Sequence, residues 1–290
     1  MLFSSVVKAF LEERMAMRYS SHTIRDYRVT FRKFLAFFGD LEFETINKHH
    51  IIQFMAAQSN VSAKTLRNYH ANLSALWQWA IQQGVCKENP VRQIKAPVAE
   101  KKTIIPFSKM EIFALLEIAS QSHYPLRDRA IILILLDTGI RASELCNLQI
   151  KDLNHVTGHI RVIGKGKKER LVPISQETMG VIDEYLANRK EISHSSPLFA
   201  LRNGKALERW KLRKVLADLG NKSQVSRVFP HRFRHTFAIQ FLRNGGNIYS
   251  LQKILGHSTL DMVKRYLAIA QYDLDHDHAI ASPVKCWNLV

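Results

Sequence analysis

The run A-I-I-L-I-L-L at residues 130–136 most narrows the folds open to this chain. Pro125 can open a helix here, because its fixed φ suits a first helical position, and Gly139 can end it. A helix with apolar side chains on every side has no face for water, so other elements must surround it. The run therefore predicts the central helix of a large core.

The pattern of residues 1–95 predicts an all-helical region, separate from the core around residues 125–139. Apolar residues recur there at spacings of three and four. Ser4-Ser5 can start the first of four helices, and Ser20, Asn47 and Ser62 precede the others at positions that suit a cap. Because the aromatic residues keep the helical period, they favour a packed core over a platform for stacking nucleic-acid bases. The region therefore predicts a bundle of four helices.

A poorly periodic stretch follows Asn89-Pro90 and continues through Pro97 to Pro106. Proline fixes φ and removes an N–H donor, so such a stretch disfavours both helix and sheet. Residues 96–106 therefore predict a linker between two domains. The length of 290 residues and the hydrophobic share of 46% suit two packed domains.

The charge balance points to a polyanionic partner. The formal net charge is +17 and the isoelectric point is about 9.9, which favours nucleic acid first and an anionic membrane surface second. No run approaches the ~18 apolar residues of a membrane span, and the N-terminus does not resemble a signal peptide. Three widely spaced cysteines without C-x-x-C spacing predict free thiols in a reducing cytoplasm.

The stretch from Pro230 to Tyr266 gathers side chains that suit phosphodiester chemistry. Pro230 fits a first helical position, so His231 and Arg234, three positions apart, share one helix face. His257 and Tyr266 add a second imidazole and a phenol. A guanidinium can bind phosphate oxygens, an imidazole can move a proton, and a phenol can act as a nucleophile.

His257 and Tyr266 can meet only if the chain breaks between them. They are nine positions apart, and nine steps of roughly 100° put two side chains on opposite faces of one helix. Gly256 can end the first helix, and Ser258 with Asp261 forms an S-x-x-D start signal for the next. We therefore expect Tyr266 to lie on a new helix that can swing toward His257.

These segments resemble a known signature. H-R-F-R at 231–234, L-G-H at 255–257 and the tyrosine at 266 resemble the tyrosine recombinases, the lambda-integrase and Xer family of site-specific DNA recombinases. T-G-I-R-A-S-E-L at 138–145 resembles the first-arginine box of that family, and G-K-G-K-K-E-R at 164–170 resembles its lysine hairpin. The positions that match the family's catalytic set are Arg141, Lys165, His231, Arg234, His257 and Tyr266.

Two of these residues have a plain structural alternative. Arg141 beside a buried helix needs an anionic partner, and Glu144 is as good a candidate as a phosphate on physical grounds alone. Lys165 lies between two predicted strands, 159–163 and 170–172, where glycines favour a hairpin turn with solvated lysines. The resemblance implies phosphate binding for Arg141 and a catalytic role for Lys165.

The resemblance also implies the fold and its domains. The expected fold is mainly α, with a small β-sheet or hairpin in a mixed α/β tyrosine-recombinase catalytic domain. Residues 1–95 would form a helical, core-binding DNA domain, 96–106 the linker, and 107–290 the catalytic domain with a C-terminal tail. A basic helix at about 207–219 could lie along DNA or form an ordinary surface helix.

The chemistry implied by the family is a strand cut with a covalent intermediate. Tyr266 would form a 3′-phosphotyrosyl bond, with His231 as a candidate base and Lys165 as the acid for the departing 5′ oxygen. Arg141 and Arg234 would bind the non-bridging oxygens, and His257 would add a donor. Because the tyrosyl bond conserves the energy of the diester and cations stabilise the charge, neither a nucleotide nor a metal is expected.

The implied partner is double-stranded DNA, with a homotetramer on two DNA sites and a possible accessory DNA-bending protein. The expected location is cytoplasmic and associated with the nucleoid. The ending A-S-P-V-K-C-W at 281–287 resembles recombinases of mobile elements more than the chromosome-resolving Xer pair. The tail could pack on a neighbouring protomer or fold back on its own domain.

Three other functions fit part of the pattern. A type IB topoisomerase would share the tyrosine chemistry but relax supercoils. A DNA-binding protein with a decayed site would keep the charge but lose catalysis. A zinc hydrolase could use His231 and His235, four positions apart, but Arg232 and Arg234 lie where the H-E-x-x-H pattern needs an acidic environment. On this pattern, His235 is expected to be a structural hydrogen-bonding residue.

Overall fold

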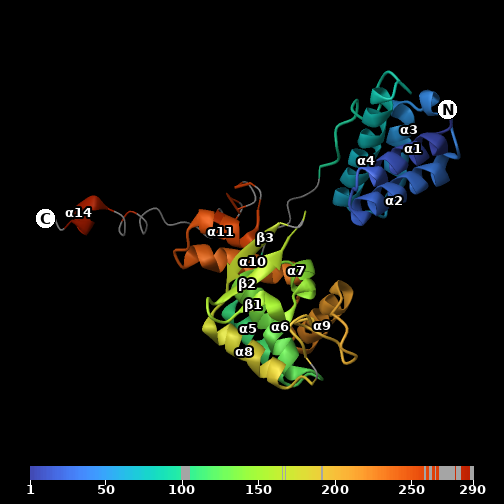
Figure 1. Cartoon of the computed structure of the whole chain (residues 1–290). Helices are drawn as coiled ribbons and strands as arrows, with labels where there is room; N and C mark the ends of the chain where they lie inside the picture. Colours follow the sequence, from blue (N-terminus) through green and yellow to red (C-terminus); the bar gives the residue numbers. More distant parts are fainter. Residues whose placement is uncertain are drawn as a thin grey trace. The chain divides into compact units, whose positions relative to one another are not determined.

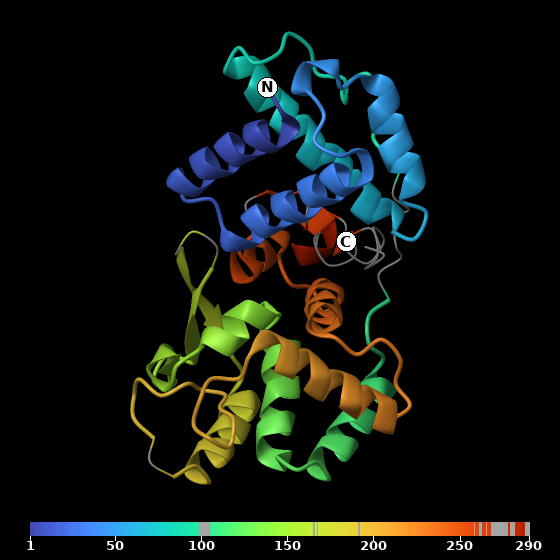
Figure 2. The same ribbon diagram turned by 90° about the vertical axis from the view of Figure 1, so that its right-hand side faces the viewer.

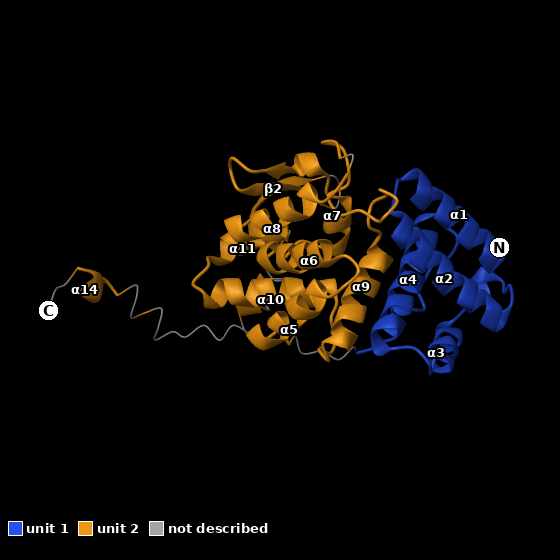
Figure 3. Ribbon diagram, turned by 90° about the horizontal axis from the view of Figure 1, so that it is seen from below, with its two compact units in different colours: residues 1–102 blue, residues 103–290 orange. Residues whose placement is uncertain are grey.

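The computed structural model describes residues 1–98, 105–164, 166, 168–190, 192–257, 259–260, 263–264, 266–267, 278 and 282–287. The chain divides into two compact units, Met1–Lys102 and Thr103–Val290 (Figure 3). The dividing point falls within the predicted linker, of which residues 99–104 lie outside the described residues. The exact domain limits therefore stay a prediction.

Unit 1 is helical (Figure 2). Its elements are α1 (Phe3–Ala16), α2 (Ser21–Phe38), the 3-10 turn η1 (Phe43–Thr45), α3 (Lys48–Ala57) and α4 (Ala63–Gln82). Ser20, Asn47 and Ser62 cap their helices as predicted, because each side chain accepts a hydrogen bond from a main-chain N–H of the first turn. The predicted start at Ser4 is wrong: α1 begins at Phe3, and the Ser4 hydroxyl instead donates to Asp40.

Aromatic rings form the core of unit 1. Phe3, Phe34 and Trp77 are each at most 1% exposed, and the Trp77 ring stacks on Phe43 with centroids 4.7 Å apart. Buried edge-to-face and stacked rings stabilise a core beyond the area they bury. The prediction that these stripes pack inward is confirmed.

Unit 2 contains helices and a small sheet (Figure 1). Its described elements are α5 (Lys109–Ser120), α6 (Pro125–Thr138), α7 (Ala142–Asn147), η2 (Ile150–Asp152), β1 (Leu153–Asn154), β2 (His159–Ile163), β3 (Glu169–Pro173), α8 (Gln176–Ala187), α9 (Arg209–Lys222), α10 (Pro230–Arg243), α11 (Ile248–Leu255) and α14 (Pro283–Cys286). No helix within the described ranges is long and apolar enough to cross a membrane.

Helix α6 occupies the centre of unit 2. It packs against α5, α8 and α10, and Ile131, Ile132 and Leu135 are fully buried. Gly139 ends it in the left-handed conformation with φ 59°. The prediction of a central helix from Pro125 to Gly139 is therefore confirmed.

The sheet has the order β1-β2-β3 and is antiparallel. Its hairpin pairs His159 with Pro173 and Ile163 with Glu169, so the predicted strand 170–172 is one residue longer at each end. Sequence reasoning missed β1, because two residues are too few to show an alternating pattern. Lys165 and Lys167 of the hairpin tip lie outside the described residues.

Helices α10 and α11 meet in a small apolar cluster. Its buried members are Ala238, Ile239, Leu242, Leu251, Leu255, Val263 and Tyr266. Asn247 caps α11 and Gly256 ends it with φ 62°, both as predicted. The predicted helix start at Ser258 and Asp261 lies outside the described residues.

Gly139 allows the end of α6 to approach α10 and α11 closely. A Cβ at Gly139 would collide with the side chains of Phe237 and Leu255. A left-handed residue with a Cβ costs about 1–2 kcal/mol, and overpacking costs about 1–3 kcal/mol. We therefore expect Gly139→Ala to lower the free energy of unfolding, measured in urea, by about 2–5 kcal/mol.

Gly204→Ala is the matched control for this variant. Gly204 also has positive φ, at 75°, but a Cβ there would meet nothing within 4 Å. It should therefore lose only the conformational part, about 1–2 kcal/mol. Equal losses for the two variants would show that close packing at Gly139 is unimportant.

Candidate active site

Arg234 lies at the centre of the candidate site. Pro230 opens α10 at its first position, which places Arg234 one turn into the helix, where its side chain is 1% exposed. Its Nη1 donates to the Gly139 carbonyl at 2.8 Å, and its Nη2 donates to the Leu255 carbonyl at 2.8 Å and to His257 Nε2 at 2.6 Å. One guanidinium thus ties together the ends of α6 and α11 and the histidine that follows.

The contact with Arg234 defines the protonation of His257. Because Arg234 can only donate, Nε2 of His257 must accept, and the ring proton lies on Nδ1. That Nδ1 is buried and has no hydrogen-bond partner among the described residues. Burial, followed by the charges of Arg234 and Arg141, lowers the pKa of His257 to about 4, so the ring is neutral at pH 7.

Burial also lowers the pKa of Arg234, to about 10, and the charge of Arg141 adds to that effect. The guanidinium nevertheless stays charged at neutral pH. A buried cation that donates to two carbonyls and a neutral imidazole favours the approach of an anion. A phosphate group is such an anion.

Arg141 precedes α7 and lies at the more open side of the site. Its main-chain N–H and its Nη1 both donate to the Glu144 carboxylate at 2.8 Å, and its Nη2 lies 3.3 Å from the Gly256 carbonyl. The side chain remains 39% exposed. The structural alternative, a salt bridge to Glu144, is therefore present, and the exposed part of the guanidinium remains accessible to a ligand.

Glu144 is held from a second side by Arg170 of β3. Nη1 and Nη2 of Arg170 donate to the two carboxylate oxygens at 3.0 and 2.9 Å, and its Nε donates to the Ile254 carbonyl at 2.7 Å. Burial alone would raise the pKa of Glu144, but the bonds from Arg170 and Arg141 outweigh it and hold the pKa at about 2. The carboxylate is therefore ionised and joins the hairpin to α7.

Sequence reasoning missed Arg170 as a site residue. A signal was present: Arg170 lies two positions before Val172, and residues two apart in a strand point to the same face, which here is the inward one. A charge on the buried face of a strand needs a partner, and Glu144 provides it. The side chain of Arg170 is 14% exposed.

Tyr266 belongs to the same site. Its side chain is 3% exposed, and its hydroxyl lies 3.0 Å from Nδ1 of His235. Its ring lies 6.4 Å from that of His257 in a near-parallel arrangement, and the exposed His231 packs edge-on against His235 at 4.2 Å. The expected convergence of His257 and Tyr266 is thus confirmed.

The structure therefore brings together Arg141, His231, Arg234, His257 and Tyr266 of the predicted set. Lys165 lies outside the described residues. His235 binds the Tyr266 hydroxyl, and no cluster of three or more His, Cys, Asp or Glu side chains that could hold a metal occurs within the described ranges.

Comparison with known proteins decides the family. The chain matches the phage integrase family over residues 107–272 and the phage integrase N-terminal SAM-like domain over residues 7–84. The chain belongs to the phage integrase family. Membership makes it a tyrosine-type site-specific recombinase, in agreement with the fold and with the signature at Arg234, His257 and Tyr266.

Relatives of this tyrosine recombinase cover nearly the whole chain. Tyrosine recombinase XerC of Staphylococcus haemolyticus is 31% identical, covering 93% of this chain and 94% of the relative. Tyrosine recombinase XerD of Staphylococcus epidermidis is 29% identical over 87% and 89% of the two chains. Among solved structures, the Tn1549 transposon integrase in complex with transposon right-end DNA matches with a TM-score of 0.83 at 21% identity, covering 97% and 99%.

The recombinase should depend on Arg170 for stability. Arg170→Met leaves the buried Glu144 carboxylate with Arg141 as its remaining arginine partner, and losing a hydrogen bond to a charged group costs about 1.5–3 kcal/mol. We expect a loss of that order in the free energy of unfolding, measured by urea denaturation. Arg129→Met is the control, because Arg129 and Glu184 form an exposed pair at 3.8 Å whose loss should cost less than about 1 kcal/mol.

Acid should destabilise unit 2 through its two half-buried histidines, His235 and His257. Burial, then the charges of His231, Arg234 and His257, lowers the pKa of His235 to about 4, similar to that of His257. Below the ordinary value of 6.5 the unfolded chain takes up protons that the folded site refuses until about pH 4, so stability falls as pH decreases through this window.

Urea unfolding between pH 7 and pH 4.5 measures this effect. The slope of the unfolding free energy against pH reports the number of protons taken up on unfolding. His235→Asn and His257→Asn should each reduce that number by up to one. His123→Asn, at an exposed histidine, is the matched control. Unchanged slopes in both site variants would contradict the neutral state of these rings.

Proposed function

We propose that this recombinase cuts and rejoins double-stranded DNA at specific sites through a 3′-phosphotyrosyl bond to Tyr266. The observation that carries the proposal is the Tyr266 hydroxyl at 3.0 Å from an imidazole, in a site that also contains Arg234 and His257. A phenol with pKa about 10 needs a proton acceptor before it attacks phosphorus, and α10 supplies two neighbouring histidines, His231 and His235.

Arg141 and Arg234 would bind the two non-bridging oxygens of the scissile phosphate. Arg141 offers an exposed guanidinium edge, and Arg234 contributes a buried cation beside it. Fixed cations in a site shielded from water stabilise the charge that develops in the transition state. His257 would add one hydrogen bond after its Nε2 exchanges Arg234 for a phosphate oxygen, which requires the proton to move to Nε2.

Lys165 would protonate the departing 5′ oxygen from the tip of the β2–β3 hairpin. The hairpin is anchored to the site through Arg170, which bonds both Glu144 and the Ile254 carbonyl. Because the phosphotyrosyl bond stores the energy of the broken diester, rejoining would need no nucleotide. The side-chain cations supply the charge stabilisation that a metal provides in other phosphoryl-transfer sites.

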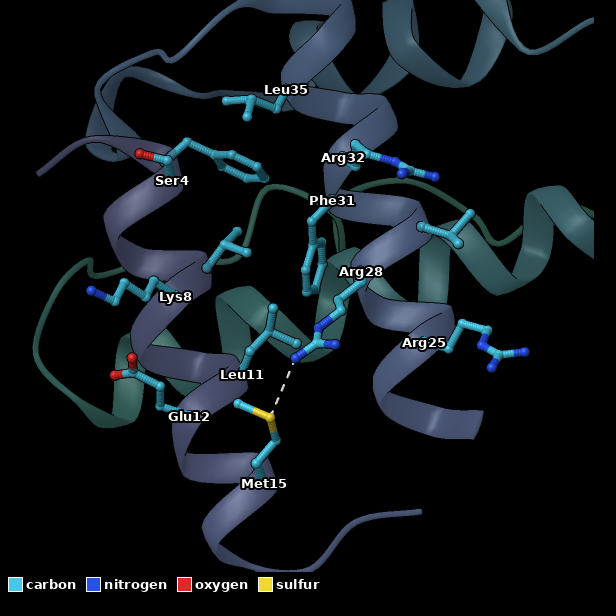
Figure 4. A pocket seen from close by; sticks show the side chains of 13 residues that line it. Ser4, Lys8, Leu11, Glu12, Met15, Arg25, Arg28, Phe31, Arg32 and Leu35 are labelled. Carbon is cyan, nitrogen blue, oxygen red and sulfur yellow. Dashed lines mark hydrogen bonds between the residues drawn. The ribbon is translucent and has the colours of Figure 1, made fainter. Parts of the chain in front are cut away.

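Unit 1 would grip DNA through the basic side of α2. Arg25, Arg28 and Arg32 are exposed at helical spacing along it. They border a groove of about 700 Å³ between α1 and α2. Figure 4 shows Arg28 reaching toward Met15 of α1, to an Nη2–Sδ distance of 3.4 Å, whereas Arg25 and Arg32 extend away from α1.

We further propose that the recombinase acts in the cytoplasm as a homotetramer on two DNA sites, with or without a DNA-bending partner. Exchange between two duplexes requires four strand cuts, and each chain offers one Tyr266 for one cut. This correspondence supports four copies.

The test of the nucleophile uses a nicked duplex that carries a site selected by binding from a random pool. The protein is incubated without metal or nucleotide, and the product is run on a denaturing gel. We expect a covalent protein–DNA band that Tyr266→Phe abolishes while DNA binding is kept. A band that survives the substitution would refute the assignment of Tyr266, and equal relaxation of supercoiled DNA without the site would favour the topoisomerase alternative.

DNA binding should weaken steeply with salt, since phosphate contacts release counterions. The slope of log affinity against log salt is about −0.9 for each phosphate contact. We expect Arg25→Gln together with Arg32→Gln to make that slope shallower by about 2 in a fluorescence-anisotropy titration. Arg129→Gln is the control at an exposed arginine of unit 2 and should leave the slope unchanged.

A further inference from the structure

The structure gives the proposed nucleophile a contact partner that the signature does not include. The family resemblance assigns the base to His231, at the first turn of α10. His235, one turn further along the same helix, however, lies within hydrogen-bond distance of the Tyr266 hydroxyl, with Nδ1 and Oη 3.0 Å apart. His235 was expected to be only a structural hydrogen-bonding residue.

We propose that His235 is the residue that takes the phenolic proton of Tyr266 during DNA cleavage. This inference rests on the proposed role of Tyr266 as the nucleophile. As the Oη–phosphorus bond forms, the proton moves from Oη to Nδ1 of His235, and the bond from phosphorus to the 5′ oxygen breaks. That oxygen takes its proton from Lys165, and rejoining runs the same steps in reverse.

The geometry of the pair suits a proton transfer. The distance of 3.0 Å from Nδ1 to Oη is within the range required of a general base. When Nδ1 accepts, the neutral imidazole carries its proton on Nε2. The rings are tilted by 55° with centroids 5.5 Å apart, so the two groups meet through their polar atoms rather than by stacking.

The surroundings keep His235 in the form that can accept a proton. The groups that face it are His231 and Arg234 from α10, His257 from the end of α11, and the Tyr266 phenol. Burial and these neighbours lower the pKa of His235, so the ring is neutral at pH 7. An incoming phosphate would add negative charge nearby, which raises the basicity of the ring at the time of attack.

His231 then has a different place in the site. It is exposed, whereas His235 is half-buried, and it packs edge-on against His235 with centroids 4.2 Å apart. An exposed imidazole next to the cationic groups can donate to the phosphate and orient the ring of His235. In this assignment His231 is a phosphate-binding and positioning residue.

The experiment measures single-turnover covalent complex formation on the nicked duplex from pH 6 to pH 10. His235→Asn is the decisive variant, because its amide can occupy the position of Nδ1 and bind the phenol but cannot take a proton. We expect a rate at pH 7 at least about 100-fold below the wild type, as for loss of a general base. The rate should rise about tenfold per pH unit as hydroxide replaces the imidazole.

Two further variants complete the test. His235→Ala opens a space, and added imidazole should restore part of its rate. His231→Asn is the matched control on the same helix, and it should lower the rate without changing the shape of the pH profile. Each variant is first shown to bind the duplex as the wild type does.

The inference is overturned if His235→Asn keeps the wild-type rate and pH profile. It is equally overturned if His231→Asn, and not His235→Asn, shows the rate that rises about tenfold per pH unit. It is also overturned if His235→Asn is inactive at every pH and imidazole does not restore His235→Ala, because His235 would then have only a packing role. Failure of the proposed function is a separate result, since it would appear as a covalent band in Tyr266→Phe.

Discussion

The candidate site depends on one buried cation. Arg234 donates to the carbonyls at the ends of α6 and α11 and to His257, so one guanidinium joins the end of α6 to the end of α11, more than a hundred residues later in the chain. Helix ends leave carbonyls without partners, and a rigid planar donor can satisfy two of them at once. Arg234 therefore helps to close the fold, and in the proposed function the same charge would bind the scissile phosphate.

A second layer of charge keeps that site in shape. Glu144 receives bonds from Arg141 on its own segment and from Arg170 on β3, and Arg170 also binds the carbonyl before the end of α11. The carboxylate stays ionised because two arginines outweigh the effect of burial. These hydrogen bonds join the hairpin, the first-arginine box and the end of α11 in one network.

Much of this architecture was predictable from local pattern. The caps at Ser20, Asn47 and Ser62, the central helix from Pro125 and the break at Gly256 follow from residue types whose backbone preferences are strong. The short strand β1 was not predictable, because two residues carry no period. The start of α1 was misjudged because Ser4 binds the distant Asp40 instead of capping its own helix.

The family and the residue types of the site follow from the amino-acid sequence, because the signature residues can be read directly and helical spacing places Arg234 one turn from His231. Which of these groups meet depends on the tertiary structure. Arg170 reaches Glu144 across the hairpin, and Tyr266 meets His235 from 31 positions further along the chain. Such contacts depend on how separate helices pack, and helical periodicity alone carries no information about packing between elements.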